Sequence, residues 1–92
     1  MKAPSSTQGT IQVLLDRLNN FRLPRALELK DKVDRGEKLD DHDLAFLHRV
    51  FDDANQAKAL AAEQPKLQSL VNQLVRLYSH ITQKALENEQ SN

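Results

Sequence analysis

The chain has 92 residues, of which 13 are Lys or Arg and 13 are Asp or Glu, so its formal net charge is zero. Leu, Ile, Val and Phe make up about 27% of the residues, which is enough apolar surface for one small domain with a single core. The absence of Cys excludes disulfides, thiolate zinc sites, iron–sulfur clusters and thiol nucleophiles. Zero net charge gives the whole chain no electrostatic preference for nucleic acid or for an anionic membrane.

Both ends of the chain are polar. Residues 1–9 contain Pro, Ser and Gly without an apolar stretch, so we expect a flexible N-terminal tail rather than a signal peptide. Residues 89–92 are expected to form a flexible C-terminal tail, which leaves a single helical domain over residues 10–88. No apolar run approaches the roughly 20 residues of a membrane-spanning helix, so we predict a cytoplasmic protein that makes no contact with a membrane.

In the first part of the chain the apolar residues recur at helical spacing, and the alternation typical of strands is missing. We expect one helical segment over residues 10–22, with Thr10 as its N-cap, and another over residues 24–35. Proline disfavours helical geometry at the preceding residue, so Pro24 marks either a break between two short helices or a kink in one long helix. Gly36 is expected to end this arm in the left-handed conformation.

The clearest start of a helix lies at Asp40, which fits an N-cap position with Asp43 three residues later. The helix that begins there is predicted to reach about Ala62, and alanines along its second half allow a neighbouring helix to approach closely. Pro65 is expected to open the last helix, which extends to about Glu87. Since the connection between these two helices is short, they must form an antiparallel hairpin.

The predicted fold is therefore all-α, an antiparallel three-helix bundle whose first helix is broken near Pro24, which gives four helical segments. Dimerisation of this bundle is a further hypothesis, and it depends on the last helix. Between Leu67 and Gln83 the only charged side chain is that of Arg76. Apolar residues cover about half of the circumference of this helix, which exceeds the roughly 100° stripe of a helix buried on one side.

Such a wide apolar arc suits either the centre of a bundle or the seam of a dimer. The candidate interface residues on this arc are Leu70, Val71, Leu74, Val75, Leu77, Tyr78 and Ile81.

Residues that can carry chemistry are few. His48 and Asp52 lie four residues apart on one helix, so they can supply two metal ligands or one acid–base pair, but they make only half a site. A surface pair between helical neighbours is the explanation that we prefer, because side chains at this spacing commonly pair. The acidic cluster over residues 40–43 lacks the spaced ligands and the glycine of a calcium loop, and helix capping accounts for it. We therefore predict no enzyme activity, no catalytic or metal-binding residue, no cofactor and no small-molecule substrate.

The charges are unevenly distributed along the chain. Residues 1–39 carry eight basic and five acidic side chains, residues 40–65 carry two and six, and residues 66–92 carry three and two. The basic stretch from Arg17 to Arg35 is interleaved with acidic residues. It can contact the phosphates of a nucleic acid, or it can pair with the acidic helix of the same bundle.

Two short stretches, residues 36–40 and 84–89, resemble small bacterial helical proteins without an assigned role, and they bring no functional residue with them. We predict a non-enzymatic protein–protein interaction module, which acts as an adaptor, an accessory subunit or a self-associating homodimer. Its partner is then another protein or a second copy. The alternative is a nucleic-acid-associated helical protein that uses the stretch from Arg17 to Arg35, which the interleaved acidic residues disfavour.

Overall fold

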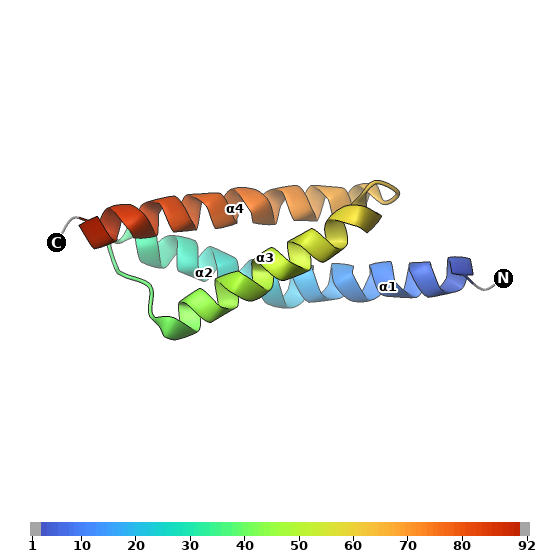
Figure 1. The fold of residues 1–92 in the computed structure, drawn as a ribbon, viewed down its shortest axis with the longest axis horizontal. Helices are drawn as coiled ribbons and strands as arrows, with labels where there is room; N and C mark the ends of the chain where they lie inside the picture. Colours follow the sequence, from blue (N-terminus) through green and yellow to red (C-terminus); the bar gives the residue numbers. More distant parts are fainter. Residues whose placement is uncertain (1–2, 91–92) are drawn as a thin grey trace.

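The computed structural model describes residues 3–90 and is built from helices joined by short turns (Figure 1). In chain order its elements are α1 (Ala3–Arg17), the π-helical segment η1 (Leu18–Arg22), α2 (Leu23–Asp34), α3 (Asp41–Ala61) and α4 (Pro65–Gln90). The first three form one bent rod, α3 returns diagonally across it, and α4 runs back in the direction of the rod (Figure 1). The bundle measures 58 × 20 × 16 Å. The predicted all-α three-helix bundle with a broken first helix is confirmed.

The break in the first rod is a change of helical pitch and not a separation into two helices. In η1 the amide of Leu23 donates to the carbonyl of Leu18, five residues earlier, and the backbone stays in the right-handed helical region throughout. Pro24 follows just after η1, in the first turn of α2, and because proline has no amide hydrogen it interrupts the backbone hydrogen bonds of the rod at this bend. Of the two predicted alternatives, one long bent helix is therefore the correct one.

The helix α1 begins at Ala3, seven residues before the predicted start at Thr10, so the predicted N-terminal tail is helical from residue 3 onward. Pro4 falls in the first turn of α1, where proline is tolerated, and the polar residues after it do not oppose a helix. The prediction for residues 1–2 lies outside the described residues.

The last helix also extends further than predicted, because α4 ends at Gln90 and so includes two residues of the expected tail. The reason is Asn88, which is only 7% exposed. Its side-chain amide donates to the backbone carbonyls of Val33 and Glu37, at 2.9 Å in each case, and joins the last turn of α4 to the end of α2. Residues 91–92 lie outside the described part of the chain.

Gly36 ends the first rod as predicted. Its φ of +87° lies in the left-handed region, which favours glycine. The amide of Gly36 donates to the carbonyl of Val33 at 3.0 Å, and that of Glu37 donates to Lys32 at 3.2 Å. These two hydrogen bonds form a Schellman motif, which turns the chain toward α3.

The core lies where α4 packs against both α2 and α3, with α1 closing the other end. The alanines of α3, among them the fully buried Ala57, let α4 approach closely along the second half of the hairpin. Side chains from every helix and from η1 contribute to the core; the largest of those that are fully buried are Leu18, Val33, Val50, Leu67, Leu74 and Ile81. None of the described helices combines the length and the apolar character that a membrane crossing requires.

Candidate interaction surface

The seven predicted interface residues divide between the core and the surface of the bundle. Leu70, Val71, Leu74 and Ile81 are at most 8% exposed, because α4 lies at the centre of the bundle. Leu77 and Tyr78 are half-buried and pack against the same core. Val75 is 51% exposed. Four of the seven predicted residues are therefore apolar because they fill the centre of the bundle. Val75 is exposed at the surface, and Tyr78 reaches the surface with a part of its side chain.

These two residues border an apolar groove between α3 and α4 with a volume of about 380 Å³, which we call the α3–α4 groove. Its floor consists of buried side chains, namely Val50, Ala54, Ala61, Val71 and Leu74. The α3 side of its rim consists of Phe51, Asn55, Lys58 and Ala62. The α4 side of its rim consists of Gln68, Asn72, Val75 and Tyr78.

The groove exists because small side chains meet where the two helices pack. Ala54 and Ala61 fill little space on α3, so the rim residues stand above a shallow floor. At one end Phe51 and Tyr78 lie with their ring centroids 5.5 Å apart and their planes tilted by 34°, a favourable aromatic arrangement. Phe51 remains 46% exposed in spite of this contact. Phe51 and Val75 therefore leave apolar surface in water on both sides of the groove.

The groove has little charge. Lys58 is the one charged residue among those that line it, and it forms no ion pair or hydrogen bond with any residue of the described chain. On the rim, the side chains of Asn55, Gln68 and Asn72 are exposed, and their amide groups form no hydrogen bond within residues 3–90. An apolar floor with an uncharged polar rim is typical of a protein contact surface, since charged residues are depleted at the centres of such interfaces.

The basic residues of the first rod lie outside the groove, and each of them pairs with a carboxylate. Arg17 and Arg22 pair with Asp53 of α3, at 3.7 and 2.7 Å. The other four basic residues also pair with carboxylates: Arg25 and Lys32 contact Asp43, Lys30 contacts Asp34, and Arg35 contacts Glu37. The stretch that the sequence offers to nucleic acid is thus largely neutralised by acidic residues of the same chain.

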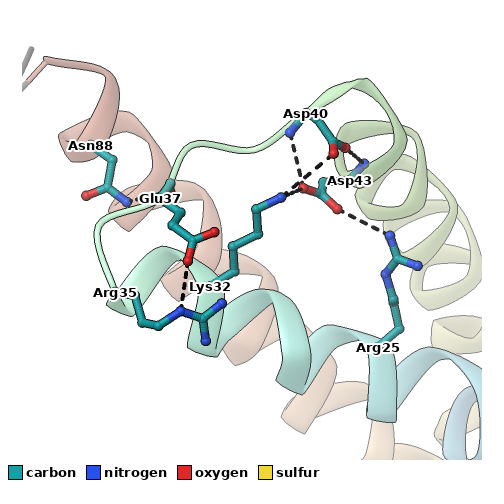
Figure 2. Close-up of polar contacts among 7 residues, drawn as sticks. All are labelled: Arg25, Lys32, Arg35, Glu37, Asp40, Asp43 and Asn88. Atoms are coloured by element: carbon teal, nitrogen blue, oxygen red, sulfur yellow. Dashed lines mark hydrogen bonds and ion pairs between the residues drawn. The ribbon is translucent and has the colours of Figure 1, made fainter.

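Asp43 connects α2 to the start of α3 (Figure 2). Its side chain accepts hydrogen bonds from Lys32 at 2.6 Å, from Arg25 at 3.2 Å and from the backbone amide of Asp40 at 3.1 Å. Asp40 in turn accepts from the amide of Asp43 at 2.9 Å, which completes the predicted capping box. Asp41, the remaining acidic residue of this turn, is exposed.

The surroundings of Asp43 act on its pKa in opposite directions. Burial raises the pKa of this carboxyl, but the hydrogen bonds from Lys32, the amide of Asp40 and Arg25 outweigh burial, so that the pKa lies below its ordinary value of 3.8. The same contact with Asp43 raises the pKa of Lys32 above 10.5. Both shifts stabilise the ionised pair.

Asp53 is a second buried carboxylate, only 7% exposed, which the sequence analysis did not single out. Its partners Arg17 and Arg22 lie more than 30 residues earlier, so no local pattern reveals the pairing. The one signal available was its position on the core side of an otherwise apolar helix face. A carboxylate placed there needs a basic partner from another element.

The histidines do not form a site within the described chain. His48 and Asp52 are both exposed, and neither forms a hydrogen bond or ion pair with the other or with any other residue of the described range. His80 does have an acidic partner, Asp34 of α2 at 2.7 Å, which spacing along its own helix does not predict. The hydrogen bond from His80, together with that from Lys30, lowers the pKa of Asp34 below 3.8.

Over residues 3–90 no group of three or more His, Asp or Glu side chains gathers to hold a metal ion. Comparison of the chain with known protein families, with curated proteins and with solved structures gives no match. On the chain's own surface, the α3–α4 groove combines an apolar hollow with exposed apolar side chains on its rim.

Proposed function

We propose that the protein is a non-enzymatic protein–protein interaction module whose docking surface is the α3–α4 groove. The observation that carries the proposal is an apolar groove bordered by the exposed side chains of Phe51 and Val75, with Lys58 as its only charged lining residue. Phe51 and Val75 are about half exposed, so covering the rest of one of them contributes about 0.7–1.5 kcal/mol. Micromolar binding corresponds to about 8 kcal/mol, so these two side chains supply a part of it and the remaining contacts of the groove supply the rest.

Two kinds of occupant fit this surface, a second copy of the chain and a different protein with an apolar helix face. Both follow the helix-in-groove mode, in which apolar side chains at helical spacing enter a groove between two helices. Either occupant makes the protein an adaptor or a subunit, and neither requires catalytic groups.

The alternative function, binding of nucleic acid through the stretch from Arg17 to Arg35, has weaker support. Arg22, Arg25 and Lys32 already donate to the nearly buried carboxylates of Asp43 and Asp53. A phosphate must displace these carboxylates before it gains the same interaction. Binding to short DNA or RNA at low salt, where phosphate contacts are strongest, would revive this alternative.

Site-specific photocrosslinking in the native host tests the proposal. A photoreactive amino acid replaces Val75 in one variant and Leu27 in another, since Leu27 is 43% exposed on α2, away from the groove. We expect a discrete covalent adduct from position 75, identified by mass spectrometry, and only background from position 27. Equal or absent crosslinking at the two positions contradicts the proposal, because the groove would then be no more occupied than the opposite side of the bundle.

A further inference from the structure

The two ends of the α3–α4 groove differ in a way that points to its occupant. Phe51 and Tyr78 stack at one end, and the unpaired Lys58 lies two helical turns away, toward the hairpin turn. Seven residues separate Phe51 from Lys58, which is about 10 Å along the helix. Asn55 and Asn72 lie between them, one on each side of the rim.

On the basis of the proposed function, we infer that the occupant of the groove is a second copy of this chain, related by a two-fold axis that lies in the plane of the contact and crosses the middle of the groove at right angles to its length. In such a contact the same surface of both copies is used, and each end of the groove in one copy faces the opposite end of the groove in the other copy. The axis brings Lys58 of each copy to the Phe51–Tyr78 end of the other. An ammonium group close to aromatic rings is attracted by them, so the two unlike ends of the groove are complementary to each other.

The middle of the groove fits the same arrangement. Asn55 and Asn72 lie nearest to the axis, and their exposed amides can both donate and accept, so they can pair with the same amides of the other copy. Polar amides at the centre of an apolar helix contact fix the register of pairing, as they do in coiled coils. The alanine-lined floor leaves space for Phe51 and Val75 of the opposing copy.

Charge favours a second copy over an unrelated partner. A two-fold contact places each charged group near its own equivalent, so a face with several like charges repels itself. The α3–α4 groove has one charged residue, and the axis directs that residue toward rings and not toward another cation. An unrelated protein requires no such neutrality, because it can present the opposite charge.

The size of the surface sets the expected strength. The whole face of the α3–α4 hairpin, about 30 Å long and about 20 Å wide across two helices, sets an upper limit of roughly 600 Å² for each copy. Standard protein interfaces bury about 800 Å² on each side. We therefore expect a dimer that dissociates in the micromolar range rather than an obligate one.

Sedimentation equilibrium of the full chain from about 5 to 500 μM tests the inference. The expected mass rises from 10.5 kDa toward twice that value across this range. In Val75→Glu a charge must be buried in the contact, and we expect a dissociation constant at least about tenfold higher. Leu27→Glu places the same charge at a similarly exposed site on α2, and it should dimerise like the original chain. Circular dichroism of both variants establishes that each remains folded.

The cation–aromatic contact has a separate test. We expect Lys58→Gln to weaken the dimer roughly threefold or more, and Lys58→Arg to retain it, since a guanidinium stacks on rings at least as well. In a mixed dimer of isotopically labelled and unlabelled chains, filtered nuclear Overhauser effects should join the Lys58 side chain to the rings of Phe51 or Tyr78 across the interface.

A constant mass of 10.5 kDa up to 500 μM overturns the inference that a second copy occupies the groove. Self-association that is equally strong in Val75→Glu also overturns it, because the contact then lies elsewhere. Failure here is distinguishable from failure of the proposed function. Crosslinking from position 75 to a different protein keeps the docking surface and changes only its occupant, whereas no crosslinking at that position removes both.

Discussion

Replacing Asp43 with alanine removes a buried carboxylate that joins α2 to the N-terminus of α3. Its carboxylate is 5% exposed and accepts hydrogen bonds from Lys32 at 2.6 Å, Arg25 at 3.2 Å and the amide of Asp40 at 3.1 Å. Asp43→Ala leaves that amide unsatisfied, takes the acidic partner from Arg25, and leaves Lys32 with Asp40 at 3.8 Å. Asp41→Ala is the matched control, because Asp41 lies two residues earlier in the same first turn and is exposed.

The cost of Asp43→Ala follows from these contacts. Breaking one side of a capping box costs about 1 kcal/mol. Losing two hydrogen bonds to charged donors costs about 1.5–3 kcal/mol each when they are fully buried, but Lys32 and Arg25 are 24% and 43% exposed and regain water. We therefore expect a total loss of about 3 kcal/mol. Asp41→Ala loses only a favourable helix-dipole interaction, about 0.5 kcal/mol.

Urea denaturation and calorimetry measure this difference. A loss of about 3 kcal/mol is a large part of the roughly 5–15 kcal/mol expected for a small domain, and it lowers the melting temperature by about 12–24 °C. Both variants are compared at low micromolar concentration, where self-association adds least to the apparent stability. If Asp43→Ala costs no more than Asp41→Ala, the connection between α2 and α3 contributes nothing and the reasoning from burial and pairing fails.

Three further predictions concern other parts of the bundle. Asn88→Ala should lower the free energy of unfolding, measured by urea denaturation, by about 1–2 kcal/mol, because two backbone carbonyls at the end of α2 lose their donor. Truncation after residue 87 should lower it at least as much, and truncation after residue 90 should leave it almost unchanged. Gly36→Ala should destabilise the fold by about 1 kcal/mol, because the φ of Gly36 is +87°. Gly9→Ala should stabilise it by about 0.5–1 kcal/mol, because Gly9 lies inside a helix that begins at Ala3. A loss of stability in Gly9→Ala contradicts that start of α1. Because the folded state lowers the pKa of Asp43 below 3.8, the stability from this carboxyl is complete above that pH and is lost as the pH falls further, so Asp43→Asn should flatten the acid limb of a stability–pH curve. An unchanged acid limb in this variant excludes the shift.

Much of the fold could be predicted from residues whose effect is confined to the backbone a few positions away in the sequence. Gly36 ends the first rod, Asp40 caps α3 and Pro65 opens α4, each through a backbone constraint or a hydrogen bond within a few residues. The ends of α1 and α4 were predicted less well. Asn88 looks like part of a polar tail in the sequence, and only its contact with carbonyls 51 and 55 residues earlier explains why α4 continues to Gln90.

The same difference between local and distant partners applies to the surface. The sequence identified the wide apolar arc of α4, but the bundle buries Leu70, Leu74 and Ile81 within its own core. Which apolar residues stay exposed depends on how α2 and α3 lie against α4, and this packing is not encoded within one helix. Phe51, on the α3 side of the groove, was not among the predicted contact residues, because its neighbour Tyr78 comes from another helix.

A concentration series of NMR amide spectra tests the central claim, that the α3–α4 groove receives a second copy of the chain. We expect that raising the concentration from about 10 to 500 μM shifts the amide signals of residues 51–62 and 68–78. The amide signals of residues 23–34 should stay unchanged, and Val75→Glu should remove the shifts. Spectra that do not change with concentration, or shifts centred on residues 23–34, are incompatible with a second copy in the groove.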